Sequence, residues 1–255
     1  RSVSFAVAAS AYDRFMGRYS AELAAPLADL ADVSHGHRAL DVGCGPGALT
    51  GELVERLGAS AVSAVDPSDS FVAAARERHP GVDVGKGAAE RLPYPDRRFD
   101  RTLAQLVVHF MADPVAGLGE MRRVTVGGGV VAACVWDHAP GGAGPLNDFW
   151  AVAQELDPAV HDESELAGAR EGHLVELFVA AGLHDVEAAV LTATVEHSTF
   201  EDWWEPFTLG VGPAGAHVAS LAPVRRDELR ERLRERLPDP PFVRSARAWA
   251  ARGIA

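Results

Sequence analysis

Residues 39–50 decide the fold and read ALDVGCGPGALT, from Ala39 to Thr50. The apolar residues 39–42 predict a buried strand, and apolar side chains at helical spacing predict a helix over 47–57. The glycine-rich turn between them lets a ligand approach backbone N–H groups at the positive end of a helix dipole, so we expect a nucleotide-like ligand here. Gly43, Gly45 and Ala48 also satisfy the dinucleotide fingerprint, so the turn alone leaves the nucleotide open.

Short apolar runs alternate with helical patterns from Ala39 to about Trp136, which is typical of a parallel sheet with helical crossovers. The predicted strands are 39–42, 61–65, 82–84, 101–108 and 130–135. The predicted helices are 11–30, 47–57, 68–78, one that begins at Asp113-Pro114, 147–156 and 172–181. One or two further strands over Val186–Val195 are expected to pair antiparallel at the sheet edge, and the residues from Phe200 onward look helical.

We therefore expect an α/β fold with a nucleotide-binding region over 37–200, a helical N-terminal cap over 1–36 and a helical C-terminal addition over 201–255. The chain has 255 residues with 24 Lys+Arg against 36 Asp+Glu, a net charge of −12, which argues against nucleic acid as a partner. No apolar run reaches the roughly 18 residues of a membrane span, so no membrane partner is predicted. Residues 3–9 faintly resemble a signal peptide, but they run at once into Tyr12-Asp13-Arg14.

Two carboxylates narrow the class of ligand that is expected at this turn. Asp66 ends the second predicted strand, 19 residues beyond Gly47, where a carboxylate can accept hydrogen bonds from ribose hydroxyls. Asp41 lies inside the first strand, where it would repel a pyrophosphate and favour a ligand that carries an amino group and a sulfonium. An NAD(P)-dependent oxidoreductase is therefore the less favoured alternative. The two cysteines, Cys44 and Cys134, follow no metal or redox spacing and suit a reducing cytoplasm.

Several motifs in order resemble class I S-adenosylmethionine-dependent methyltransferases of the type 11 subgroup, over roughly residues 10 to 137. They are DVGCGPG at 41–47, Asp66, GAAERLPYPD at 87–96, Phe99-Asp100, LVVH at 106–109, the helix entered at Asp113-Pro114, and Arg122-Arg123-Val124 before Gly127–Gly129. The resemblance implies a Rossmann-like seven-stranded sheet, mostly parallel with the last strand antiparallel. It also implies S-adenosylmethionine as cofactor, S-adenosylhomocysteine as product, and methyl transfer to a substrate nucleophile.

The resemblance also implies the cofactor contacts. The backbone of the three glycines would lie against the methionine part, Asp66 would bind the ribose, and Ala89 would offer its N–H to the adenine. Members commonly carry Asp where this chain has Ala88, which removes one hydrogen bond worth about 1 kcal/mol unless Glu90 or a water replaces it. An N-terminal helix would close over the cofactor and bring in Tyr12 and Arg18. The expected cofactor residues are Tyr12, Arg18, Asp41, Gly43, Cys44, Gly45, Gly47, Asp66, Pro67, Ala88, Ala89, Glu90, Gln105 and Leu106.

Methyl transfer from a sulfonium depends mainly on alignment and on exclusion of water, but a hydroxyl acceptor also needs a base. His109 at the end of the fourth predicted strand and His138 after the fifth are the candidate catalytic bases, with pocket lining as the alternative for both. No metal site is predicted, because His35 and His37 lack further ligands.

The acceptor pocket is expected from aromatic residues outside the core motifs, which suit a hydrophobic or planar small molecule. Its candidates are His109, Trp136, His138, Phe149, Trp150, Trp203, Trp204 and Phe207, and the alternative for the aromatic residues is an ordinary core. The sequence thus favours a cytoplasmic small-molecule methyltransferase. A protein that binds the cofactor without methylating, such as a pericyclic catalyst or a regulator, is the second hypothesis, because function resides in the site rather than the fold.

Overall fold

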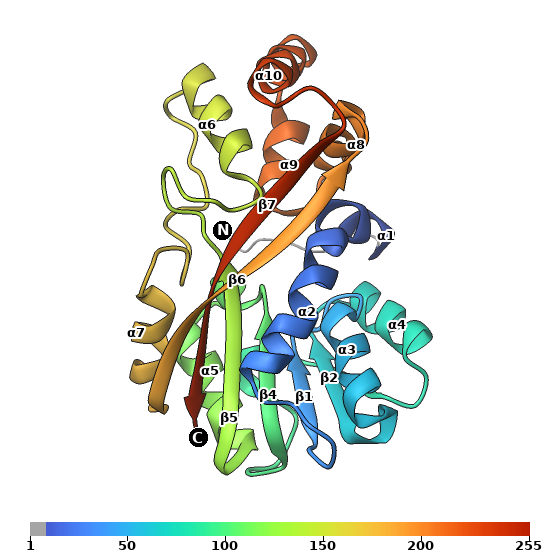
Figure 1. The fold of residues 1–255 in the computed structure, drawn as a ribbon, viewed down its shortest axis with the longest axis vertical. Coiled ribbons are helices and arrows are strands. Elements are labelled where there is room, and N and C mark those ends of the chain that lie inside the picture. The colour runs from blue at the N-terminus through green and yellow to red at the C-terminus, as the bar shows by residue number, and fades with distance from the viewer. Residues whose placement is uncertain (1–8) are drawn as a thin grey trace.

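A twisted seven-stranded sheet with helices on both faces forms the frame of the computed structural model, which describes residues 9–255 (Figure 1). The strands are β1 (Ala39–Val42), β2 (Val62–Asp66), β3 (Asp83–Lys86), β4 (Phe99–Gln105), β5 (Thr125–Trp136), β6 (His184–His197) and β7 (Phe242–Ile254). Their order in the sheet is β3-β2-β1-β4-β5-β7-β6. Strands β1 to β5 pair in parallel, whereas β7 is antiparallel to both β5 and β6, so the predicted sheet is confirmed.

Helices fill the connections between the strands. They are α1 (Ala9–Tyr12), the π-helical turn η1 (Asp13–Gly17), α2 (Arg18–Leu30), α3 (Ala48–Leu57), the 3₁₀ turn η2 (Ala59–Ala61), α4 (Asp69–Arg78), η3 (Ala89–Arg91), η4 (Val108–Phe110), α5 (Pro114–Val124), α6 (Asn147–Leu156), α7 (His173–Ala180), α8 (Phe200–Trp204), η5 (Glu205–Leu209), α9 (Gly212–Ser220) and α10 (Pro223–Arg236). The start of α5 follows from its sequence, because the Asp113 carboxylate accepts a hydrogen bond from the backbone N–H of Ala116 and Pro114 occupies the first turn.

The C-terminal region differs from its prediction. Helices were expected throughout 201–255, but they end at Arg236 and Phe242–Ile254 is the strand β7. Alanine and arginine give this segment a high helix propensity, yet Ala246, Ala248 and Ala250 are buried at alternate positions between β5 and β6. Pairing on both edges of the strand therefore overrides the local preference.

The end of β4 also differs from its prediction. The strand ends at Gln105 rather than Val108, and Leu106 turns the chain with a φ of 61°. His109 consequently lies in η4, on the turn that follows the strand, and its side chain is buried. This places it above the carboxyl edge of the sheet.

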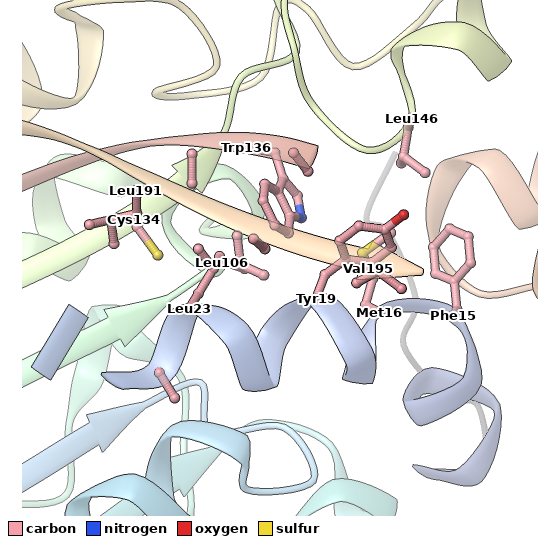
Figure 2. Close-up of a cluster of buried hydrophobic side chains, with 14 of the residues drawn as sticks. Phe15, Met16, Tyr19, Leu23, Leu106, Cys134, Trp136, Leu146, Leu191 and Val195 are labelled. Carbon is pink, nitrogen blue, oxygen red and sulfur yellow. The ribbon is translucent and has the colours of Figure 1, made fainter. Parts of the chain in front are cut away.

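Helix α2 covers one face of the sheet and packs over β4, β5 and β6. The predicted helix over 11–30 is confirmed as α1, η1 and α2, and residues 3–8 of the leader-like stretch lie outside the described residues. In Figure 2, Tyr19 and Leu23 of α2 face Cys134 and Trp136 of β5 in one apolar cluster. This packing fixes η1 next to the glycine turn.

Candidate cofactor and acceptor site

The turn after β1 requires glycine at three positions. Gly43, Gly45 and Gly47 have φ values of 70°, 53° and 101°, a region that favours glycine. A Cβ on Gly43 would come within 2.5 Å of a Val107 methyl carbon, and one on Gly47 within 2.6 Å of Nε2 of His79. A Cβ on Gly45 would meet no atom within 4 Å. The backbone at Gly45 therefore borders open space.

That space is a cavity of about 480 Å³ between the glycine turn and the N-terminal helices. Its volume lies within the range of about 300–1,000 Å³ that is usual for small-molecule sites. Eight of the predicted cofactor residues line it: Tyr12, Arg18, Asp41, Gly43, Cys44, Gly45, Gly47 and Gln105. The structure thus brings the methionine side of the predicted site together.

Two buried acceptor atoms in the cavity wall have no partner within the described chain. Gln105 donates from Nε2 to the carbonyl oxygen of Ser20 at 2.9 Å, which leaves its Oε1 unpaired. The hydroxyl oxygen of Ser20 is also unpaired. Because buried acceptors without a donor are unfavourable, these atoms suit a ligand that carries N–H donors, such as the ammonium group of a methionine moiety.

Asp41 adds a carboxyl group to the same wall. Its side chain is 1% exposed and accepts a hydrogen bond of 2.7 Å from the Thr50 hydroxyl. Burial raises the pKa of Asp41 to about 7, although the bond from Thr50 opposes this rise. A cationic ligand would stabilise the ionised form, so the residues of this cavity fit the amino acid end of S-adenosylmethionine.

Asp66 performs a different local task from the predicted one. Its carboxylate accepts hydrogen bonds from the backbone N–H of Gly45 at 2.9 Å and of Ser68 at 2.8 Å. Asp66 therefore fixes the glycine turn to the end of β2, and it does not line the cavity. A contact with ribose stays a prediction.

The other residues predicted to contact the adenine do not line the cavity. Pro67 and Ala88 are exposed, and Ala89 is buried in η3. The carboxylate of Glu90, considered as a substitute for the missing Asp, accepts hydrogen bonds from the backbone N–H of Ala112 and Asp113. Glu90 thus holds the loop before α5.

Sequence reasoning predicted the end of α4 but missed that Arg78 and the following His79 line the first cavity. The distance between Nε2 of His79 and the carbonyl oxygen of Gly47 is 2.8 Å. The guanidinium of Arg78 donates a hydrogen bond of 3.3 Å to the carbonyl oxygen of Pro46. Arg78 also pairs with Asp13 of η1. These residues join the N-terminal segment to the glycine turn through tertiary packing, for which no local sequence signal exists.

Arg18 lines the cavity, but its guanidinium is engaged elsewhere. It forms an ion pair of 3.0 Å with Asp202 and donates to the carbonyl oxygen of Glu196. Asp202 in turn lies 3.5 Å from Nδ1 of His197. These contacts join the N-terminal helices to β6 and α8, and a contact of Arg18 with the cofactor carboxylate stays a prediction.

A second cavity of about 30 Å³ adjoins the first, because Tyr12 lines both. It contains His109 and His138, whose ring centres are 6.1 Å apart, and both leave Nδ1 buried and unpaired within the described chain. Burial lowers the pKa of His138 to about 4, and that of His109 falls well below its ordinary value for the same reason. The other lining residues are Tyr12, Phe15, Met16, Leu106, Phe110, Trp136, Leu146, Glu163, Val211, Gly212 and Pro213.

Figure 2 shows Phe15, Met16, Leu106, Trp136 and Leu146, which form part of the apolar wall of this second cavity. Leu106, predicted as a cofactor residue, thus lines the second cavity and not the first.

Glu163 is the charged residue of the second cavity that the sequence did not reveal. It is 3% exposed, and its Oε2 accepts a hydrogen bond of 2.8 Å from Nε1 of Trp150. Burial raises the pKa of Glu163 to about 7. Trp150, predicted to line the acceptor pocket, does not line this cavity but orients the Glu163 carboxyl group, which does.

The other aromatic candidates lie farther from the histidines. Trp203 and Phe207 border a separate small cavity of about 20 Å³ beside Arg18 and His197. Phe149 stacks on Phe207 with ring centres 4.8 Å apart, and Trp204 stacks on the same ring at 6.1 Å. Phe149 and Trp204 line none of these three cavities and form core between α6 and α8.

Comparison with known proteins agrees with this geometry. Residues 40–133 match the family model of a methyltransferase domain. The match spans less than half of the chain and supports the predicted class I S-adenosylmethionine-dependent methyltransferase. The predicted family and its cofactor, S-adenosylmethionine, are thereby confirmed.

Two curated relatives carry different acceptors in their names. The chain is 32% identical to malonyl-[acyl-carrier protein] O-methyltransferase of Serratia marcescens, over 60% of each chain. It is 31% identical to 2-methyl-6-phytyl-1,4-hydroquinone methyltransferase 1 of Oryza sativa subsp. japonica, over 60% of this chain and 43% of that one. The matches therefore span less than two thirds of these relatives.

Solved structures share the fold. Phosphoethanolamine N-methyltransferase 2 of Haemonchus contortus, in complex with S-adenosyl-L-methionine, superposes with a TM-score of 0.58 at 17% identity, over 96% of this chain and 56% of that one. The [4+2]-cyclase SpnF superposes with a TM-score of 0.57 at 21% identity, over 92% of this chain and 80% of that one.

The described part of the chain has no helix that combines the length and the apolar character needed to cross a membrane.

Proposed function

We propose that this protein transfers the methyl group of S-adenosylmethionine to a small-molecule acceptor. The observation that carries the proposal is that the glycine turn, Asp41 and the unpaired side-chain amide oxygen of Gln105 lie on one cavity of about 480 Å³. Bound there, the cofactor supplies an activated methyl group on a sulfonium. The carboxyl group of Asp41 and the side-chain amide oxygen of Gln105 would hold the ammonium group of the cofactor. The glycine turn would lie against its methionine part.

The chain contributes mainly orientation and exclusion of water, which suits an in-line displacement. Tyr12 lines both cavities, so a methyl group held beside Tyr12 would lie near the cavity that His109 and His138 line. Burial raises the pKa of Tyr12 to about 12, so its hydroxyl keeps its proton at neutral pH. The Tyr12 ring would therefore act as a neutral wall.

The acceptor proposed for this site is hydrophobic or planar. The second cavity supports this, since its lining is apolar apart from the Tyr12 hydroxyl, the two histidines and Glu163. No Arg or Lys of the described residues lines it, which supports a partner other than nucleic acid. A cytoplasmic location is consistent with Cys44 and Cys134, both buried and free.

Calorimetry with S-adenosylmethionine, S-adenosylhomocysteine and NAD tests the proposal. We expect the first two ligands to bind and to raise the melting temperature, and NAD to do neither. Formation of S-adenosylhomocysteine with an acceptor then separates methyl transfer from binding alone. Tight binding with no turnover over a broad acceptor panel would favour the non-methylating hypothesis instead.

A further inference from the structure

Glu163 lies where a proton acceptor for the methyl acceptor would be needed. It comes from the irregular segment between α6 and α7, yet it is buried and lines the second cavity, as His109 and His138 do. Trp150 of α6 holds Oε2 by a hydrogen bond of 2.8 Å. No donor within residues 9–255 contacts the other oxygen, Oε1.

We propose that Glu163 is the general base of this site and that the acceptor group is an uncharged hydroxyl, which the two histidines help to position. This inference rests on the proposed function. It assigns the catalytic proton to a residue outside the methyltransferase motifs, and it moves His109 and His138 from candidate bases to positioning residues.

The charges around the cavity support a hydroxyl rather than a carboxylate. Within the described chain no Lys or Arg lines the cavity, so an acceptor carboxylate would find no cationic partner and would face Glu163. An amine would pair with the Glu163 carboxylate as an ammonium ion and would lose its nucleophilic lone pair. A hydroxyl can donate to Glu163 and to an unpaired histidine nitrogen without either penalty.

The titration behaviour of the three groups agrees with this assignment. Burial lowers the pKa of both histidines, which makes them neutral but weak bases near pH 7. Burial raises the pKa of Glu163 to about 7, with a smaller rise from Asp162 and an opposing effect of the Trp150 hydrogen bond. A base works best when its pKa is close to the working pH, so Glu163 matches the task better than either histidine.

The step balances as a simple displacement. The hydroxyl O–H bond breaks and its proton goes to Oε1 of Glu163, while the oxygen lone pair forms the bond to the methyl carbon. The bond between methyl and sulfur breaks with its electron pair on sulfur, which converts the sulfonium into the neutral thioether of S-adenosylhomocysteine. The proton leaves Glu163 for solvent when the product departs.

The cavity of about 30 Å³ has room for a hydroxyl group but not for a whole aromatic acceptor. The remainder of the acceptor must therefore take space that η1 or the N-terminal end of α9, at residues 211–213, now fills. Binding of the acceptor is expected to move one of these segments.

The test compares Glu163→Gln with Glu165→Gln, a matched change of an exposed residue on the same segment. Phenol and benzoate serve as probes of similar size that present a neutral hydroxyl and a carboxylate. With the complex of protein and S-adenosylhomocysteine, we expect phenol to bind and benzoate not to bind. Turnover of phenol should fall by on the order of 100-fold or more in Glu163→Gln, with unchanged affinity for S-adenosylhomocysteine, and should persist in Glu165→Gln.

Infrared titration provides a readout that is independent of turnover. Asp41 and Glu163 should both contribute to the carboxyl absorption that titrates near pH 7 in the wild-type protein. The Glu163 contribution is the part that is lost in Glu163→Gln, and this part should shift when phenol binds. Preference for benzoate, failure of phenol to bind, or undiminished phenol turnover in Glu163→Gln would overturn the role of Glu163 while leaving methyl transfer intact. Failure of S-adenosylhomocysteine to bind would overturn the proposed function itself.

Discussion

Gln105 donates a hydrogen bond of 2.9 Å to the carbonyl oxygen of Ser20, and this bond fixes the Gln105 amide with its own oxygen buried and unpaired in the cavity wall. The last residue of β4 is thereby tied to α2. Any ligand that enters the cavity meets an acceptor whose direction is already set, so little side-chain entropy is lost on binding.

Replacement of Gln105 by Leu should weaken binding of S-adenosylmethionine. A hydrogen bond to a charged group is worth about 1.5–3 kcal/mol, so the dissociation constant should rise by about 10- to 100-fold. Calorimetry measures this change. Gln154→Leu, on α6 and outside the cavity, is the control. Equal affinities of Gln105→Leu and wild type would show that the Gln105 oxygen does not contact the cofactor.

The pKa of Asp41 predicts how stability depends on pH. Burial raises it from 3.8 to about 7, so the folded protein holds this proton more tightly than the unfolded chain. The resulting contribution to stability is full below pH 3.8 and is lost as the pH rises through 7. Thermal denaturation of Asp41→Asn should therefore depend less on pH between 4 and 8 than that of wild type. Asp227→Asn, on the exposed side of α10, should behave like wild type.

The same carboxyl group should make cofactor binding depend on pH in the opposite direction. The ammonium group of S-adenosylmethionine is attracted only to the ionised form of Asp41, so affinity should rise as the pH increases from 5.5 to 7.5. Calorimetric titrations at several pH values should show this rise in wild type and not in Asp41→Asn. A similar rise in both proteins would assign it to another group.

Two glycines of the turn, Gly45 and Gly47, should respond differently to alanine. Gly47→Ala places a Cβ within 2.6 Å of His79 and should destabilise the protein itself. Gly45→Ala meets no atom, so it should cost only about 1 kcal/mol of folding stability for its left-handed backbone but should block the cofactor. Melting curves and calorimetry separate the two effects. Gly36→Ala, also at positive φ and in open space, controls for backbone strain alone.

Asp66→Ala removes the acceptor of two backbone N–H groups. We expect a loss of about 2 kcal/mol in the free energy of unfolding, measured with urea, because Gly45 and Ser68 lose their partner. Binding of the cofactor fragments methionine and adenosine, followed by NMR, distinguishes the two roles of Asp66. Loss of both fragments indicates a disordered turn, whereas loss of adenosine alone indicates the predicted ribose contact.

Local patterns were sufficient for the parallel half of the fold. The glycine turn, the Asp113 cap with Pro114 and the alternation of strands and helices all depend on short-range backbone geometry, which the sequence encodes directly. Strand β7 was missed because its assignment depends on two neighbours that are distant in sequence. An Ala- and Arg-rich segment carries no local signal of this pairing.

The same limit applied to the site. The glycines, Asp41 and Gln105 could be predicted because they belong to ordered motifs next to strands. Arg78, His79 and Glu163 reach the cavities through the packing of α4 and through the irregular segment that Trp150 orients. Aromatic composition predicted more pocket-lining residues than line the second cavity. Aromatic residues such as Phe149 and Trp204 are equally suited to fill a core.

The position of β7 has a consequence for synthesis of the protein. A ribosome that has translated as far as α10 has produced both neighbours of this strand, β5 and β6, but not the strand that joins them. Until residues 242–254 emerge, two long edges with unpaired backbone groups face one another and can recruit the wrong strand. Nascent chains stalled near residue 240 should therefore depend on chaperones more than the completed protein does.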